Sequence, residues 1–324
     1  MANIAITESC NLNCKYCFAN EYVNKQRNDI TLENFVTAKE FILSSTEFNG
    51  RIGIIGGEPT VHPEFDKILE HLDQDERVKS VTIFTNGIKL EEFLPIVTKS
   101  KFKFLINLNS PLDIGSPNYE RALRNIDSLI EAGKQNDLTL GLNIYKPDLD
   151  YSFYFEALES RMLKTSRLSI TVPNGEQAVG LERHIAFKNA LYNIIVELMF
   201  RGVRFLIDCN KPPKCIFTEE EIEKLTLIGA CDLRKPHGID LSMCSCNPVI
   251  DILPDLTAIR CFGLSRVSKV KISDFSTIND LREYYQKTFD ENLISSPLKE
   301  ECVNCQLFKE QKCNSGCFAN RRCC

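Results

Sequence analysis

The stretch that decides the fold is ESCNLNCKYC, residues 8–17, which carries three cysteines, Cys10, Cys14 and Cys17. Their i, i+4, i+7 spacing could form one buried stripe of a helix, because a free cysteine packs as a small hydrophobic residue. The two asparagines between the thiols, however, favour a turn over a helix interior. A loop around a soft metal is therefore the better interpretation, and three thiolates would leave one iron of a cubane cluster open to a small molecule.

The composition also favours metal or redox chemistry. The 324 residues include fifteen cysteines but only four histidines, none of which forms a ligand-like pair. Nothing at the amino end resembles a signal peptide, so a cytoplasmic protein is expected, and a reducing compartment argues against a disulfide framework. The net charge of −5 and the lack of a long basic run argue against a nucleic-acid partner. No run is apolar and long enough to predict a membrane span.

The first two thirds of the sequence alternate β-rich and helical runs. Thr31 is a plausible helix N-cap, Gly133 and Gly202 are plausible C-caps, and a further helix is expected over residues 218–227. Near-continuous apolar strands separated by amphipathic helices predict parallel strands joined by crossovers, with chemistry at their carboxyl ends. The predicted strands cover residues 3–7, 51–55, 80–85, 102–109, 138–145, 167–172 and 203–209.

The segments that follow the first two predicted strands carry two motifs. CNLNCKYC has the CxxxCxΦC form of the radical S-adenosylmethionine (SAM) superfamily, with Tyr16 as the aromatic residue, and GGEP at 56–59 resembles that family's second motif. Alone, GGEP would be an ordinary strand-to-helix turn. The resemblance implies a [4Fe–4S] cluster on Cys10, Cys14 and Cys17, whose open iron is chelated by the amino and carboxylate groups of SAM. One electron then cleaves SAM to methionine and a 5′-deoxyadenosyl radical.

The same resemblance implies a set of residues around the cofactor. Gly56 and Gly57 would let the backbone approach the ligand with unusual dihedral angles, and Glu58 would accept a hydrogen bond from its ammonium group. Each polar residue at a strand end could equally be a cap. The family's acidic SxD pattern after the fourth strand is replaced here by NLNSPLD. The residues expected near the cofactor are Tyr16, Gly56, Gly57, Glu58, Pro59, Thr85, Asn86, Asn107, Asn109, Ser110 and Asn143.

The C-terminal third holds most of the cysteines. CVNCQLFKEQKCNSGC, residues 302–317, has C-x2-C-x7-C-x3-C spacing, which suits a structural zinc or a further iron–sulfur cluster. CNPVIDILPDLTAIRC, residues 246–261, predicts a hairpin with a cysteine at each end. Together they resemble the SPASM or twitch extension of radical enzymes, which binds one or two auxiliary [4Fe–4S] clusters. That pattern usually has glycine where this chain has Leu256.

The resemblance leaves two ligand partitions open. In the crossed arrangement, Cys246, Cys261 and Cys317 share one cluster with Cys209, Cys215, Cys231 or Cys244, and Cys302, Cys305 and Cys313 take Cys323 or Cys324. In the uncrossed arrangement, one cluster has Cys209, Cys215, Cys246 and Cys261, and the other has Cys302, Cys305, Cys313 and Cys317.

The expected architecture is an α/β fold, a partial (β/α)6 TIM-like barrel over residues 1–209, followed by a small Cys-rich cluster-binding domain over 210–324. The resemblance implies an enzyme that abstracts hydrogen, first of all a peptide or protein maturase that oxidises or crosslinks its substrate. Its electron donor would be a flavodoxin or ferredoxin. Because the chain begins directly at its first strand, a separate leader-recognition protein is expected.

Two other functions remain open at this point. One is a small-molecule dehydrogenase or epimerase that acts on a sugar-like alcohol. The other is a non-catalytic iron–sulfur electron-transfer protein, which would have no use for GGEP after a second strand. No catalytic acid, base or hydrogen donor can be assigned from the sequence.

Overall fold

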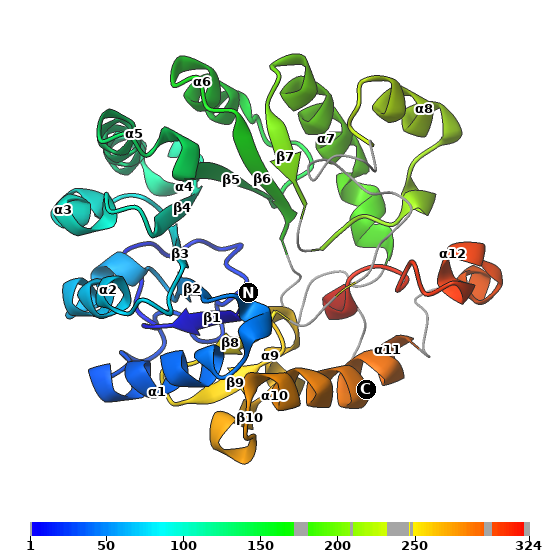
Figure 1. Cartoon of the computed structure of the whole chain (residues 1–324). Helices are drawn as coiled ribbons and strands as arrows, with labels where there is room; N and C mark the ends of the chain where they lie inside the picture. Colours follow the sequence, from blue (N-terminus) through cyan, green and yellow to red (C-terminus); the bar gives the residue numbers. More distant parts are fainter. Residues whose placement is uncertain are drawn as a thin grey trace. The chain divides into compact units, whose positions relative to one another are not determined.

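The computed structural model describes residues 2–171, 181–207, 210–231, 246, 249–294 and 300–320 (Figure 1). The chain divides into two compact units, one of Met1–Thr139 with Pro248–Thr288 and one of Leu140–Asn247 with Phe289–Cys324. The predicted domain boundary between residues 209 and 210 stays a prediction. Within the described ranges, no helix has the length and apolar character that a membrane crossing requires.

The first unit is built on a sheet whose strand order is β10-β9-β8-β1-β2-β3-β4. Strands β8, β1, β2, β3 and β4 are parallel neighbours, and β8, β9 and β10 pair antiparallel. Helices α1, α2, α3 and α5 lie along the outer side of β1–β4 (Figure 1). The elements are β1 (Ala2–Ala5), α1 (Leu32–Leu43), β2 (Arg51–Ile55), α2 (Phe65–Gln74), β3 (Ser80–Thr85), α3 (Leu94–Val97), β4 (Phe102–Asn107), α4 (Pro111–Ile114), α5 (Ser116–Glu131), β8 (Asp251–Ile252), β9 (Thr257–Ile259), α9 (Ser265–Ser268), β10 (Val270–Lys271) and α10 (Ile278–Tyr285).

The second unit has the same parallel arrangement. Strand β6 pairs parallel with β5 on one side and with β7 on the other. Its elements are most of β5 (Leu138–Ile144), α6 (Ser152–Ser160), β6 (Thr165–Ile170), α7 (Leu181–Phe200), β7 (Arg204–Leu206), α8 (Glu219–Leu227), α11 (Glu291–Ile294) and α12 (Gln306–Lys309). Parallel strands with helical crossovers confirm the predicted α/β class.

The helix ends follow the local sequence. The Thr31 side chain accepts a hydrogen bond from the Asn34 amide and begins α1, as predicted. Gly133 and Gly202, with φ of 81° and 63°, follow α5 and α7 in the left-handed region that glycine adopts without a steric penalty. Thr218 caps α8 in a reciprocal capping box with Glu221.

An apolar layer lies on one face of the sheet in the first unit. Because it draws on β1, β2, β3, β9 and the residue that follows β8, it joins the hairpin to the parallel strands. Each large apolar side chain that is buried in this way contributes about 1.5–3 kcal/mol. The layer consists of Ala5, Ile55, Leu253 and Ile259, with Tyr22, Phe84 and Phe262 packed against them.

The predicted hairpin of residues 246–261 is present as β8 and β9. Asp251 pairs with Ile259, and Asn3 of β1 pairs with Asp251. The turn contains Leu256 with φ of 60°, a left-handed conformation that costs a side-chain-bearing residue roughly 1–2 kcal/mol. The position at which the SPASM pattern has glycine therefore has the backbone geometry that glycine favours, although this chain has leucine there.

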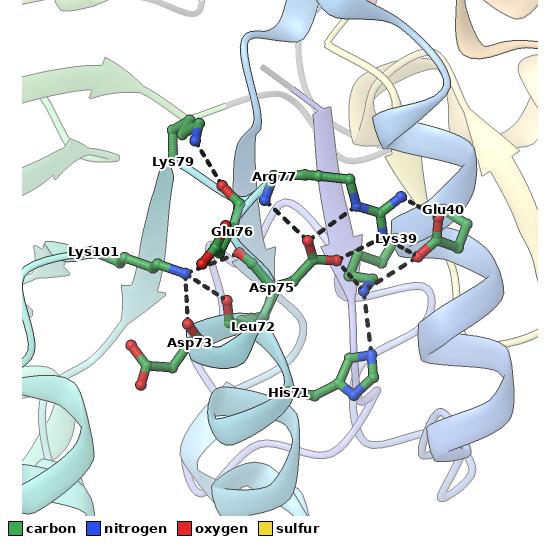
Figure 2. Close-up of polar contacts among 10 residues, drawn as sticks. All are labelled: Lys39, Glu40, His71, Leu72, Asp73, Asp75, Glu76, Arg77, Lys79 and Lys101. Carbon is green, nitrogen blue, oxygen red and sulfur yellow. Dashed lines mark hydrogen bonds and ion pairs between the residues drawn. The ribbon is translucent and has the colours of Figure 1, made fainter.

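Charged side chains gather where the chain leaves α2 and enters β3 (Figure 2). The Lys39 side chain is only 4% exposed, and its Nζ donates to Asp75 Oδ2 at 2.6 Å. The Arg77 guanidinium bonds to both Asp75 and Glu40. These partners hold the pKa of Asp75 well below its usual range, with the bond from Arg77 as the largest cause. We call Lys39, Glu40, Asp75 and Arg77 the charge cluster.

Two further side chains in Figure 2 extend the charge cluster. His71 lies 3.2 Å from Lys39 Nζ, and its pKa is lowered by burial and by the Lys39 charge, so its neutral ring can accept this bond. Lys101 donates to the backbone oxygens of Leu72, Asp73 and Asp75 at the end of α2. A cation at a helix C-terminus satisfies carbonyl groups that have no partner within the helix.

Candidate active site at the carboxyl ends of the strands

The three thiols lie on the loop that follows β1, in the first unit. The Cys10 amide donates to Asn24 Oδ1 at 2.8 Å, and Asn24 Nδ2 donates to the Leu12 oxygen at 3.0 Å. Asn24 has φ of 58°, a left-handed conformation that asparagine tolerates better than most residues. The Cys17 amide donates to the Cys14 oxygen at 3.0 Å. The thiol-bearing segment is therefore a turn closed by Asn24, not a helix.

The GGEP segment packs directly against this loop. The Gly57 amide donates to the Thr7 oxygen at 2.8 Å, and the Glu58 amide donates to the Ser9 oxygen at 2.9 Å. A Cβ at Gly56 would lie 2.5 Å from the Thr7 oxygen, and one at Gly57 would lie 2.2 Å from the Ser9 oxygen. Neither glycine has a positive φ, so the expectation of unusual dihedrals is wrong. The missing side chains make room for the backbone of the thiol-bearing loop.

Glu58 joins the segments after β2 and β3. Its side chain is 1% exposed, and Oε1 accepts bonds from Thr60 Oγ1 at 2.8 Å and Thr85 Oγ1 at 2.6 Å. Oε2 accepts from the Asn86 amide at 2.7 Å. Burial nevertheless raises the pKa of this carboxyl group. No other bond to Oε2 exists within the described residues, so this oxygen keeps capacity for a further donor.

Asn86 connects the TNG segment to the thiols. Its Nδ2 donates to Asn11 Oδ1 at 2.7 Å, and its Oδ1 accepts from the Ile88 amide at 3.0 Å. Thr85 Oγ1 also accepts from the Gly87 amide at 3.0 Å. The loops after β1 and β3 are thus linked by the side chains of Asn11 and Asn86, and those after β2 and β3 by the bonds of Glu58 to Thr85 and to the Asn86 amide.

Burial dominates the electrostatics of the three thiols. Burial is the largest cause that raises the pKa of Cys10 to about 12 and that of Cys14 to about 11, and it raises the pKa of Cys17 as well. Neighbouring thiols and Glu58 add to the shift at Cys10. Bound iron would reverse this balance, since a coordinated thiol is deprotonated.

The end of β4 offers an acceptor for a ligand. Asn107 Oδ1 is buried without a hydrogen-bond donor in the described part of the chain. Asn109 Oδ1 accepts from the Tyr16 hydroxyl at 2.7 Å, which connects this strand end to the thiol-bearing loop. Ser110 accepts from the Leu112 amide and caps α4, so here the alternative interpretation as a cap applies. Three gathered thiols, the remaining capacity of Glu58 and the Asn107 oxygen fit a cluster with a polar organic ligand.

The other predicted site residues are distributed over both units. Asn143 lies on β5 in the second unit, and Cys261 follows β9 in the first. The second unit holds Cys215, Cys231, Cys246, Cys302, Cys305, Cys313 and Cys317. Cys209, Cys244, Cys323 and Cys324 lie outside the described residues. Cys302 Sγ lies 3.2 Å from Ser315 Oγ.

Across the described ranges, no three His, Cys, Asp or Glu side chains lie close enough together to hold one ion. A cubane cluster does not require its ligands to meet at one ion, because each of its cysteine ligands binds a separate iron.

Sequence reasoning missed Asn24 and Thr60. Asn24 closes the thiol-bearing loop although it lies fourteen residues after Cys10. The only signal in the sequence was that asparagine tolerates the left-handed φ that this position has. Thr60 directly follows GGEP and orients the Glu58 carboxylate.

The sequence matches a family model and several curated proteins. Residues 4–148 match the family model of the Radical SAM superfamily. The chain is 31% identical over 159 residues to a probable GTP 3′,8-cyclase of Methanocaldococcus jannaschii, which is 44% of this chain and 50% of that protein. It is 34% identical over 100 residues to molybdenum cofactor biosynthesis protein 1 of Homo sapiens, 30% of this chain and 15% of that protein. The chain thus matches half or less of the length of these relatives.

Solved structures resemble nearly the whole chain. Streptococcus suis SuiB bound to S-adenosylmethionine superposes with a TM-score of 0.63 at 18% identity, over 98% of this chain and 73% of that one. The enzyme anSMEcpe with bound AdoMet and the Kp18Cys peptide gives 0.66 at 17% identity, over 98% and 88%. This likeness confirms the predicted fold class, the partial TIM-like barrel with a Cys-rich C-terminal region. The predicted [4Fe–4S] cluster and SAM are the cofactors of the superfamily that the family model describes.

Proposed function

The chain contains a radical SAM domain, residues 4–148, and from this premise we propose that it is a radical SAM enzyme whose substrate is a peptide or protein. When bound, the cluster and SAM supply a one-electron cleavage and a 5′-deoxyadenosyl radical that abstracts hydrogen. The observation that carries the proposal is the linkage of the thiol-bearing loop to GGEP and TNG through Glu58 and Asn86.

The residues of this chain would bind the cluster and orient its organic ligand. Cys10, Cys14 and Cys17 would hold the cluster on a loop that Asn24 has already closed. Glu58 Oε2 can accept a bond from an ammonium group, and a hydrogen bond to a charged group contributes about 1.5–3 kcal/mol. Asn107 Oδ1 can accept from a ligand hydroxyl or amine. The apolar layer includes Ile55 of β2 and Phe84 of β3, which directly precede Gly56 and Thr85.

We choose a peptide substrate because the structural likeness extends over nearly the whole chain. SuiB and anSMEcpe resemble 98% of the chain, including its Cys-rich part, and anSMEcpe is described with a bound peptide. We further propose auxiliary iron–sulfur clusters on the C-terminal cysteines in one of the two partitions, with a flavodoxin or ferredoxin as the electron donor.

A second candidate substrate is a nucleotide. The observation in its favour is the 31% identity over 159 residues to a probable GTP 3′,8-cyclase. That similarity covers 44% of this chain, and it is compatible with a shared radical-generating domain and different substrates.

A substrate competition tests the choice. Reconstituted protein would be reduced under anaerobic conditions with SAM and given a Cys- or Ser-containing peptide library or GTP, with the Cys14→Ala variant as the inactive control. We expect peptides to raise 5′-deoxyadenosine release above the uncoupled rate and to lose hydrogen mass. Stimulation by GTP together with no response to any peptide would overturn the peptide proposal.

A further inference from the structure

A groove of about 490 Å³ lies in the second unit, between α6, α7 and the loop that precedes α6. Its apolar lining includes Phe155 of α6 and Ile194 of α7. All of its lining residues are described, and none belongs to the candidate active site. A concave surface that combines apolar lining with a few polar groups is typical of a ligand site.

Negative charge dominates the groove. Four carboxylates, Asp150, Glu156, Glu159 and Glu197, face one guanidinium, that of Arg201. Asp150 accepts two bonds from Ser152. Glu156 is exposed and has no ion-pair partner in the described ranges. The groove therefore has a surplus of carboxylates that can attract a cationic ligand.

Arg201 is the one cation of the groove lining, and it is already engaged there. Its guanidinium lies 4.9 Å from the centre of the Phe155 ring and forms ion pairs with Glu197 and, from its buried Nε at 4.0 Å, with Glu159. Asp150 and Glu156 therefore remain as the lining carboxylates without an ion-pair partner in the described ranges.

We propose that this groove binds a peptide segment that carries a lysine or arginine beside an apolar side chain. The cation lies at Glu156 and Glu159, and the apolar side chain packs on Phe155 and Ile194. The inference rests on the proposed peptide substrate and specifies its chemistry. The same carboxylates repel a nucleotide triphosphate, so the groove serves peptides and not GTP.

Binding of defined peptides tests the groove. The probe is a fluorescent octapeptide in which lysine alternates with leucine. The control peptide has glutamate in place of each lysine. We expect the reconstituted wild-type protein to bind the lysine peptide more tightly than the glutamate peptide, with an affinity that falls as salt rises. Glu156→Lys combined with Glu159→Gln should weaken this binding about tenfold. Glu223→Lys, which reverses the charge at one exposed position on α8, should leave it unchanged.

Two readouts separate this inference from the proposed function. Uncoupled SAM cleavage should be equal in the wild type and the groove variants, because these residues lie outside the thiol-bearing loop. Equal affinity for both peptides, or unchanged binding in the double variant, would overturn the proposal that the groove binds a cationic peptide. If the groove binds the lysine peptide as expected while only GTP stimulates turnover, the binding site stands and the peptide maturase proposal fails.

Discussion

The two ends of the sheet in the first unit treat buried polar groups in opposite ways. Near the amino end of β3, Lys39, Asp75 and Arg77 satisfy one another, and the pKa of Asp75 is lowered. At the carboxyl ends, the thiols of Cys10 and Cys14 are half-buried, and burial raises their pKa values. One end stabilises the charges that it contains, whereas the environment of the other end favours the neutral thiols.

The comparison shows where stability and chemistry reside in this fold. Residues at the amino ends of parallel strands commonly serve stability, and those at the carboxyl ends serve catalysis. Substitutions at the charge cluster should therefore change unfolding and spare the cofactors. Substitutions at the thiols should do the reverse.

The largest expected effect is at the thiols. Replacing Cys10, Cys14 and Cys17 together with alanine should remove about four irons per chain and all SAM cleavage, since a cubane would lose its ligands. Unfolding of the iron-free protein in urea should differ little from that of the iron-free wild type. Iron analysis and 5′-deoxyadenosine release measure the loss, and an unchanged iron content would break the comparison.

The next largest effect is at the opposite end. Asp75→Ala should lower the free energy of unfolding by about 2 kcal/mol, because the buried Lys39 ammonium loses its nearer carboxylate and keeps only Glu40, at 3.2 Å. Iron content and SAM affinity should not change. Asp66→Ala removes an exposed carboxylate from α2 and serves as the control. A loss of SAM binding in Asp75→Ala would show that the two ends are coupled.

A smaller effect is expected at Glu58. Glu58→Gln keeps the shape of the side chain but weakens its bond to the Asn86 amide and any bond to a ligand ammonium. The affinity for SAM should fall about tenfold, or about 1.4 kcal/mol, with the cluster intact. Isothermal titration of the reconstituted protein measures it. An unaltered dissociation constant for SAM would mean that Glu58 only connects the loops after β2 and β3 and does not contact the ligand.

The smallest effect concerns pH. The pKa of Asp75 is lower in the folded protein than in the unfolded chain, where an aspartate titrates near 3.9. Its stabilisation is therefore complete above about pH 5 and is lost as the pH falls toward the folded-state pKa. The unfolding free energy of the iron-free wild type should fall more steeply below pH 4 than that of Asp75→Asn. Parallel slopes would contradict the assigned shift.

Much of the secondary structure could be predicted because its signals are local. The expected strands 51–55 and 80–85 agree with β2 and β3 to the residue, and Thr31 and Gly133 mark helix ends as expected. The expected strand 102–109 ends instead at Asn107, because the apolar run continues past the last paired residue. β7 is likewise shorter than predicted and covers Arg204–Leu206.

The tertiary contacts could not be predicted, because their partners are far apart in the sequence. Lys39 meets Asp75 across 36 positions, and no local pattern distinguishes this pair from other surface charges. The sequence placed both GGEP and TNG near a cofactor but gave no sign that Glu58 and Thr85 bond to each other. The parallel pairing of β8 with β1 was equally hidden, since Asn3 and Asp251 are 248 residues apart.

The closure of the thiol-bearing loop by Asn24 has a consequence for conformational entropy. Many small metal-binding segments order only when the metal arrives, so part of the binding free energy is consumed in folding. Here the Cys10 amide, the Ser9 oxygen and the Asn11 side chain are already engaged by protein partners. Iron should therefore bind this loop without inducing a disorder-to-order transition, and the assembly rate should depend on the supply of iron and sulfide.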